Sequence, residues 1–196
     1  MITKLFSGHY QLRICGWIAA CAMASSALAA QTPAPRIRSE VNNSEISTLK
    51  GSLHPLAQTQ VDAGRMPADV RLHGISIVFN RSAAQQADLE ALIAAQQDPK
   101  SPLYHQWLTP DQFAARFGMA QADIEAVQSW LQQRGFSVDS VARSKNLIRF
   151  SGSVRQVEQA FQTEMHYYGA KGSQHFAPSS ALSVPTAKAQ VFTWFR

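Results

Sequence analysis

Apolar residues at alternate positions predict several short strands from residue 71 onward. Ile75, Ile77 and Phe79 occupy every second position, and this spacing predicts a strand over residues 71–80. A polar run, 143–146, has the character of a hairpin connection. The segments expected to be extended on either side of this run and after it are 136–141, 147–151, 163–168 and 175–177.

Three predicted helices begin with the same pair of residues, a Ser or Thr followed three positions later by a Gln. In this capping box each side chain accepts a backbone N–H group that the helix itself leaves without a partner. The pairs are Ser82 with Gln85, Thr109 with Gln112, and Ser153 with Gln156, and Pro110 adds a favourable first helical residue. A fourth helix, over 121–134, is predicted by apolar residues spaced for one helical face, namely Ile124, Val127, Trp130 and Leu131.

The order of these elements predicts the fold class. A strand is followed by helices, two strands joined as a hairpin, a helix and a last strand, which matches the split βαβ arrangement of ferredoxin-like folds. We therefore expect an α+β, ferredoxin-like domain with an antiparallel sheet, helices on one face and an extra helix in the first crossover. Apolar residues make up 45% of the chain, which is enough material for one core.

Residues 1–30 have the layout of a secretory signal peptide. Lys4 and Arg13 give a basic start, residues 14–23 are apolar, and small residues around Ala29 form a cleavage site. The apolar run is too short to predict a membrane span. The mature protein is therefore expected to be secreted or periplasmic.

A lipoprotein is the alternative for the N-terminal region. Residues 18–21 resemble a lipobox, in which Cys21 would carry a lipid anchor. Cys15 is the other cysteine, so either route of processing leaves no disulfide and no catalytic thiol. Removing residues 1–30 lowers the Lys and Arg count from 18 to 16 against 13 acids, so the net charge falls from +5 to +3. This modest charge, together with export, argues against a nucleic-acid partner.

The sequence contains no pattern typical of a catalytic or metal site. It lacks Gly-x-Ser-x-Gly, His-Glu-x-x-His and glycine-rich phosphate loops. Carboxylates on the predicted helices, Glu158 among them, are expected to be solvated. No two histidines beyond residue 30 are three or four positions apart; they are His54, His73, His105, His166 and His175. We therefore expect a non-catalytic domain that binds no metal and no cofactor.

One run in the first crossover has a recognisable order. It reads Ser101-Pro102-Leu103-Tyr104-His105-Gln106-Trp107-Leu108-Thr109-Pro110-Asp111-Gln112-Phe113, and Phe117-Gly118 follows it. This run resembles the signature of the sedolisin prodomain, the activation domain of kumamolisin-type serine-carboxyl peptidases. The resemblance covers about residues 46–192. It continues downstream at Trp130, Gly135, Phe136, Phe150, Gly152 and Phe161.

The resemblance implies a fold like that of subtilisin propeptides. It also implies a role as a folding chaperone and an acid-released inhibitor of a sedolisin-type catalytic domain, in cis or in trans. That catalytic domain carries the family's Glu, Asp and Ser, with the Ser in a Gly-Thr-Ser context, and also its calcium ligands. The present sequence has no Gly-Thr-Ser, so no catalytic or calcium-binding residue is carried over to it.

The resemblance also suggests how the chain is divided. The parts are a signal peptide (1–30), an irregular leader segment rich in Pro and Gly (31–68), the activation domain (69–192) and an off-pattern tail (193–196). We expect a peptidase precursor cut short before its catalytic domain, by an early stop, a frameshift or a fragmentary gene model. The alternative is a stand-alone exported or lipid-anchored binding module, either a trans inhibitor of a peptidase or a ligand-binding domain.

Basic residues are the candidates for a surface that faces the partner. If they meet carboxylates there, acid would protonate those carboxylates and remove the pairing. His105 could also become charged and repel the partner. The candidates are Arg71, Arg143, Lys145, Arg149 and His175.

Two further expectations concern how the domain would dock. A C-terminal segment, about residues 177–190, is expected to lie like a substrate near the partner's cleft. Tyr104, Trp107 and Phe113 are expected to pack in the core because apolar residues flank them; a sugar-stacking platform is the alternative for these three rings.

Overall fold

The computed structural model describes residues 33–37, 45–55, 57, 61–169, 174–189 and 191–194, and it shows an α+β fold built from antiparallel strand pairs. The helices are α1 (Ala83–Gln97), α2 (Pro110–Phe117), α3 (Gln121–Gln133), α4 (Val154–Phe161) and α5 (Thr186–Ala189). The strands are β1 (Ile46–Thr48), β2 (Asp62–Arg65), β3 (Arg71–Phe79), β4 (Ser137–Val141), β5 (Leu147–Ser153), β6 (Met165–Tyr168), β7 (His175–Pro178), β8 (Ser183–Pro185) and β9 (Phe192–Trp194). The predicted fold class is confirmed.

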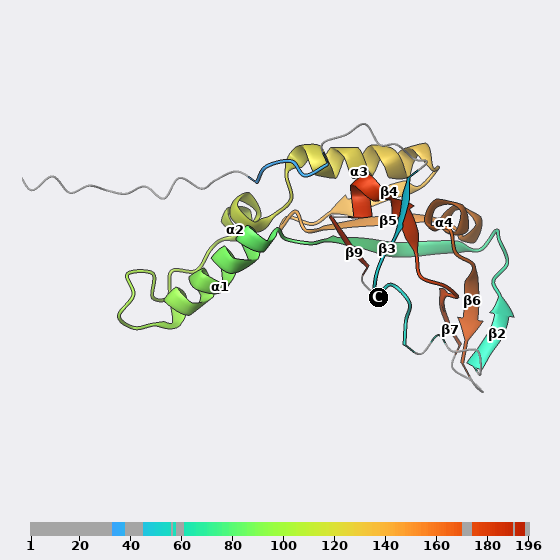
Figure 1. Ribbon diagram of the computed structural model, residues 1–196, viewed down its shortest axis with the longest axis horizontal. Coiled ribbons are helices and arrows are strands. Elements are labelled where there is room, and N and C mark those ends of the chain that lie inside the picture. The colour runs from blue at the N-terminus through green and yellow to red at the C-terminus, as the bar shows by residue number, and fades with distance from the viewer. Residues whose placement is uncertain are drawn as a thin grey trace, which may run out of the picture.

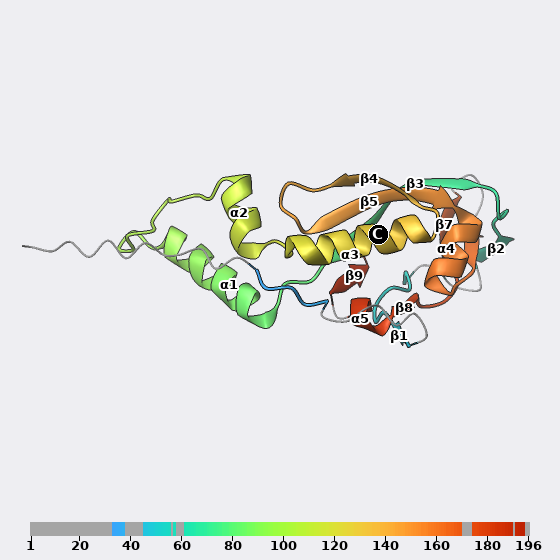
Figure 2. The ribbon, with the colours of Figure 1, turned by 90° about the horizontal axis from the view of Figure 1, so that it is seen from above.

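The main sheet has four strands in the order β4-β5-β3-β9. Helices α3 and α4 lie over one face of it, while α1 and α2 project beyond one end as an arm (Figures 1 and 2). A three-stranded sheet, β2-β6-β7, lies at the other end, and β1 pairs with β8 in a two-stranded sheet. The domain is therefore elongated, with the main sheet between the arm and the small sheet.

Strand pairing differs from a regular ferredoxin-like sheet in one respect. In that fold the strand after the last helix returns to pair beside the first strand. Here β6 follows a left-handed cap at Gln162 (φ 52°) and pairs instead with β2 and β7. The place beside β3 is taken by β9, and only along Ile77–Phe79. The leader segment 31–68 was expected to be irregular, but it contains β1 and β2. Strand β9 includes Thr193 and Trp194 of the off-pattern tail.

The local signals for helix starts are confirmed. All three capping boxes are formed in both directions, with the Ser or Thr side chain accepting a backbone N–H and the Gln side chain accepting the N–H of the cap residue. The residues predicted for the fourth helix form α3, whose apolar face is buried. Short-range polar contacts therefore fix where these helices begin.

Five aromatic rings form the centre of the core. The ring of Phe161 on α4 lies 5.6 Å from Trp130 on α3 and 6.2 Å from Phe150 on β5, measured between centroids. Phe136 packs edge-on against Phe150 at 5.0 Å, and Phe192 lies 6.5 Å from Trp130. All five are less than 5% exposed. These contacts join both covering helices to the sheet, including its last strand.

Gly152 on β5 lets one of these rings approach the backbone. A methyl group at this position would lie 2.4 Å from Cδ1 and 2.7 Å from Cε1 of Phe136. It would also lie 2.9 Å from the side-chain oxygen of Gln156, which closes the capping box of α4. Both neighbours are held in place, so any side chain here would have to displace the sheet from the helix.

We predict that Gly152→Ala destabilises the domain by about 1–3 kcal/mol, because overpacking of a filled core forces side chains off their preferred rotamers. Urea unfolding followed by far-UV circular dichroism measures this change. Ser140→Ala on the neighbouring strand β4 is the matched control, because Ser140 is exposed. Equal stabilities of the two variants would contradict the account.

Lys188 on α5 is a buried cation. Its side chain is 0% exposed, and among the described residues its Nζ has no hydrogen-bond partner. Nζ lies 5.4 Å from the centroid of the Trp130 ring, and the guanidinium carbon of Arg134 lies 5.8 Å from the same centroid. Burial, and secondly the charge of Arg134, lowers the pKa of Lys188 to about 8. A charged Lys188 therefore costs stability at neutral pH.

Replacing Lys188 with Met is expected to raise the melting temperature at pH 7 by about 3–6 °C. The folded-state pKa lies below the ordinary value of 10.5, so the cost is complete below pH 8 and disappears as the pH rises toward 10.5. Thermal melts at pH 7 and pH 10 should therefore show a smaller gap between the two proteins at the higher pH. A lower melting temperature for the variant at both pH values would mean that the contact with Trp130 outweighs the burial cost.

Candidate docking site

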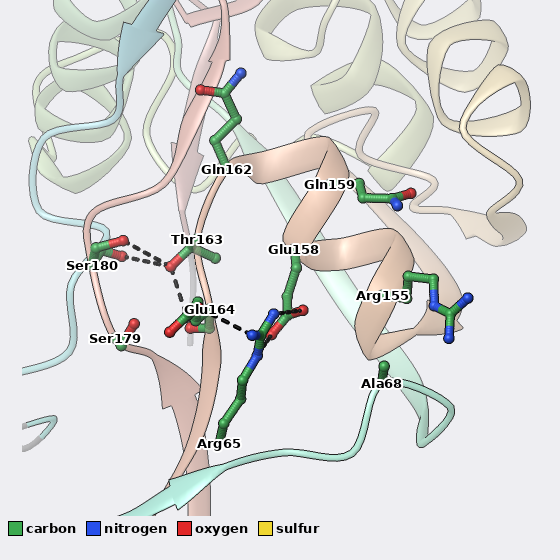
Figure 3. A pocket seen from close by; sticks show the side chains of 10 residues that line it. All are labelled: Arg65, Ala68, Arg155, Glu158, Gln159, Gln162, Thr163, Glu164, Ser179 and Ser180. Atoms are coloured by element: carbon green, nitrogen blue, oxygen red, sulfur yellow. Dashed lines mark hydrogen bonds and ion pairs between the residues drawn. The ribbon is translucent and has the colours of Figure 1, made fainter.

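A polar pocket of about 810 Å³ lies where α4 meets β6 (Figure 3). Arg65 of β2 reaches into it from below, and Glu158 and Arg155 come from α4. On the other side Thr163 and Ser180 face each other, with their hydroxyl oxygens 3.0 Å apart. The pocket therefore joins three segments that are distant in sequence.

Glu158 is the central group of this pocket. Its two carboxylate oxygens accept from the guanidinium of Arg65, with Nε–Oε1 at 3.2 Å and Nη2–Oε2 at 2.8 Å. Oε1 also accepts the backbone N–H of Met165 at 3.0 Å. The carboxylate is 10% exposed, so the expectation of a solvated Glu158 is wrong. The pKa of Glu158 is lowered, mainly by the hydrogen bond from Arg65, while burial raises it and so opposes the shift.

A second group of charges continues the contact along the small sheet. Arg65 also lies 3.2 Å from Glu164, and Nδ1 of His166 lies 2.8 Å from a carboxylate oxygen of Asp62. The pKa of Asp62 is lowered, mainly by the hydrogen bond from the backbone N–H of Gly64. Burial opposes this shift by raising the pKa, and the contact with His166 lowers it further. We call Arg65, Glu158, Glu164, His166 and Asp62 the ionic latch, because they tie β2 and β6 to α4.

A larger, apolar groove of about 1110 Å³ lies beside the first half of β3. Its floor contains Leu72 and Met165, and Phe176 of β7 stands at its rim with 54% of its side chain exposed. Because β9 covers only Ile77–Phe79, the described residues place no strand beside Arg71–Ser76 on this edge of β3. Three histidines, His54, His73 and His175, are among the lining residues.

These two sites have the features of a binding surface. Within the described ranges, no three His, Cys, Asp or Glu side chains are grouped so that they could hold a metal ion. Five polar residues of the pocket are engaged with one another in hydrogen bonds and ion pairs, namely Arg65, Glu158, Glu164, Thr163 and Ser180. An apolar groove beside an uncovered strand edge suits an extended polypeptide.

Comparison with known proteins identifies the family. The model of the pro-kumamolisin activation domain matches residues 59–193. The chain belongs to the pro-kumamolisin activation domain family. It is 28% identical over 162 residues to xanthomonalisin of Xanthomonas sp. (strain T-22), which is 81% of this chain and 20% of that protein. It is also 28% identical over 109 residues to sedolisin of Pseudomonas sp. (strain 101), covering 56% of this chain and 19% of that protein.

A fungal relative gives the same picture. Tripeptidyl-peptidase sed1 of Aspergillus fumigatus is 30% identical over 108 residues, 53% of this chain and 17% of that protein. The activation domain thus spans about a fifth of the length of the curated relatives it matches. The matched family model describes the activation domain and not the catalytic domain.

The activation-domain signature divides between the core and the surface. Its buried members support the sheet and helices, and they are Phe117, Gly118, Trp130, Phe136, Phe150, Gly152 and Phe161. Thr109 and Pro110 start α2, and Leu108 is half-buried. Gly135 follows α3 with φ 81°, a conformation that favours glycine.

Two of the three signature rings expected in the core are exposed. Trp107 is 65% exposed and Tyr104 37%, so core packing is wrong for both. Phe113 is half-buried and packs against Phe117, with centroids 5.2 Å apart and planes tilted by 53°. The flanking apolar residues misled the prediction, because the whole run lies on the arm and away from the sheet.

The candidate partner-facing residues are not gathered in one place. His175 lines the groove, and Arg71 begins the strand whose edge borders it. Arg149 is exposed on the face of β5 opposite the helices, since its neighbours on either side along the strand are buried beneath them. Arg143 forms an exposed ion pair with Asp111 at 3.0 Å, and Lys145 occupies a turn with φ 52°. Contact with a partner stays a prediction for all five.

The C-terminal segment is packed and not extended. Leu182, Val184 and Lys188 are each at most 1% exposed, and β8 pairs with β1. Within the described part of residues 177–190, apolar side chains contribute to this domain's own core. That this segment lies near a partner's cleft stays a prediction.

Sequence patterns did not reveal the ionic latch. Arg65 and Glu158 are 93 positions apart, so no local spacing relates them.

The signal peptide and the lipid anchor at Cys21 fall outside the described residues. In the part of the chain that the structure describes, no helix is long and apolar enough to cross a membrane.

The latch predicts an acid-sensitive stability. The pKa of Glu158 is lower in the folded state than its ordinary 4.5, so its contribution is present above about pH 4.5 and is lost as the pH falls through the folded value. The melting temperature of wild type should fall between pH 6 and pH 3. Glu158→Gln should have a lower melting temperature than wild type at pH 6 and a smaller fall over the same range. Asp111→Asn is the matched control, because Asp111 and Arg143 are about three-quarters exposed and add little. Identical pH profiles for wild type and Glu158→Gln would contradict the role of the latch.

Proposed function

We propose that this activation domain is the folding chaperone and inhibitor of an exported sedolisin-type catalytic domain, and that acid releases it. The match over residues 59–193 carries the proposal, together with relatives that are about five times as long as their matched region. Chaperoning and inhibition have one energetic source, because a domain that binds only the folded enzyme also shifts the folding equilibrium toward it. The partner can be supplied in cis or in trans.

The groove beside β3 supports such a role. It offers an apolar surface, bordered by an uncovered strand edge, to which main-chain groups of a partner could hydrogen-bond. The exposed ring of Phe176 stands at its rim. The domain itself needs no metal or cofactor for this, since the family's calcium belongs to the catalytic domain.

The ionic latch supports release by acid. Met165 and Tyr168 of β6 line the groove, and Glu158 holds the start of β6 to α4. Protonation of Glu158 would weaken its bonds to Arg65 and loosen the wall of the groove. Because the pKa of Glu158 is lowered, this step follows at a lower pH than the protonation of ordinary carboxylates on the partner. Arg71 and Arg149, which are exposed, are the residues of this chain best placed to meet such carboxylates.

Binding to the part of xanthomonalisin that lies outside the matched region, isolated after that enzyme has folded with its own activation domain, tests the function. We expect this chain to bind it at pH 7 and to inhibit its peptidase activity, with a dissociation constant at least about tenfold larger at pH 4, which corresponds to about 1.4 kcal/mol. Calorimetric titration at both pH values measures the change, and Asp111→Asn serves as the control. Affinity that is equal at the two pH values would refute acid release, and absence of binding at both would refute the inhibitor role.

A further inference from the structure

Seven of the eight large exposed apolar side chains of the described residues gather in two places, and the eighth is Ile46 on β1. Leu53, Val61 and Phe176 line the groove. The other group lies at the outer end of the arm, where α1 ends and the chain turns back toward α2 (Figure 1). It consists of Ile93 (44% exposed), Leu103 (38%), Tyr104 (37%) and Trp107 (65%), which we call the arm tip. An apolar cluster held away from the core marks an interaction site.

The rings of the arm tip are arranged in a stack. Tyr104 and His105 lie with centroids 3.8 Å apart and planes 22° apart. His105 and Trp107 follow at 5.7 Å and 23°. His105 has φ 57°, a strained value for a residue other than glycine, and such strain persists where the surroundings enforce it.

Backbone hydrogen bonds hold this loop in one shape. The N–H of His105 donates to the carbonyl of Gln96 at 3.1 Å, and the side-chain amide of Gln96 donates back to the carbonyl of Gln106. Gln96 is only 6% exposed, so these bonds are shielded from water. Tyr104 donates its N–H to Ser101 at 3.0 Å. The loop is therefore preorganised, which lowers the entropic cost of binding through its side chains.

The two helices of the arm are fixed to each other. Arg116 of α2 donates to Asp88 of α1 at 2.7 Å, and the Gln85 side chain donates to the carbonyl of Gly118 at 3.1 Å. Arg116 also lies over the ring of Phe117, 5.1 Å from its centroid. The arm therefore holds one internal shape, with the arm tip at its outer end.

We propose that the arm tip is a second docking surface for the sedolisin-type catalytic region, with Trp107 as its main anchor. This rests on the proposed function. About four-fifths of xanthomonalisin lies outside the region matched by this chain, so the family provides a large partner surface. Loop residues 98–107 carry one acid, Asp98, and one lysine, Lys100. A near-neutral aromatic surface fits an apolar depression on a protein and lacks the basic residues that an anionic membrane attracts.

Trp107→Ala tests this proposal against the same part of xanthomonalisin at pH 7. Large aromatic anchors at interfaces dominate affinity, so we expect the dissociation constant to rise about tenfold or more. The melting temperature should change by less than about 2 °C, because the ring is mostly exposed. Ile46→Ala is the matched control; Ile46 is 46% exposed but lies on β1, and its affinity should equal that of wild type. Hydrogen exchange should also show protection of residues 98–107 in the complex.

The other outcomes separate the two proposals. If wild type binds and Trp107→Ala binds equally well, the arm-tip proposal is overturned and the proposed function stands. If wild type does not bind, both are overturned. Trp107→Ala could instead abolish self-association, or binding to phosphatidylserine vesicles, and leave the affinity for xanthomonalisin unchanged. Such a result would assign the surface to a second copy or to a lipid, and it would also overturn the arm-tip proposal.

Discussion

Packing of Phe161 against Trp130 and Phe150 is the contact on which the rest of this domain depends. Through it α4 and α3 meet over β5, and Phe192 brings the C-terminal strand into the same cluster. With α4 fixed in this way, Glu158 on its outer side can reach Arg65 and Met165. The apolar core thus places the charged latch, and the latch in turn places the small sheet that forms one wall of the groove.

The sequence predicted those parts of the fold that depend on neighbouring residues. Capping boxes such as Ser153 with Gln156 act over three positions, and the alternation around Ile77 acts over two, so both are readable from local patterns. The pairing of β6 with β2 joins residues about a hundred positions apart, and several registers satisfy the same apolar pattern. The strand expected at 163–168 therefore exists as β6, but its expected place beside the first strand of the main sheet was wrong.

The candidate site was less predictable for a related reason. A run of aromatic residues flanked by Leu103 and Leu108 looks the same in sequence whether it fills a core or covers a surface intended for a partner. Only the position of the arm beyond the end of the sheet distinguishes the two cases for Trp107. The family signature combines both kinds of residue, since Phe117 is buried while Tyr104 is not. A signature alone therefore does not separate stability from recognition.

The short pairing of β9 with β3 has a consequence for handling the isolated domain. An exposed strand edge is a template on which another chain can add a strand. On β3 that edge runs from Arg71 to Ser76 beside an apolar groove, and among the described residues only the three positions that face β9 are capped on that side. This edge is thus a place where a second copy of the domain could add a strand, and Arg71 is the charged residue of that stretch that opposes it.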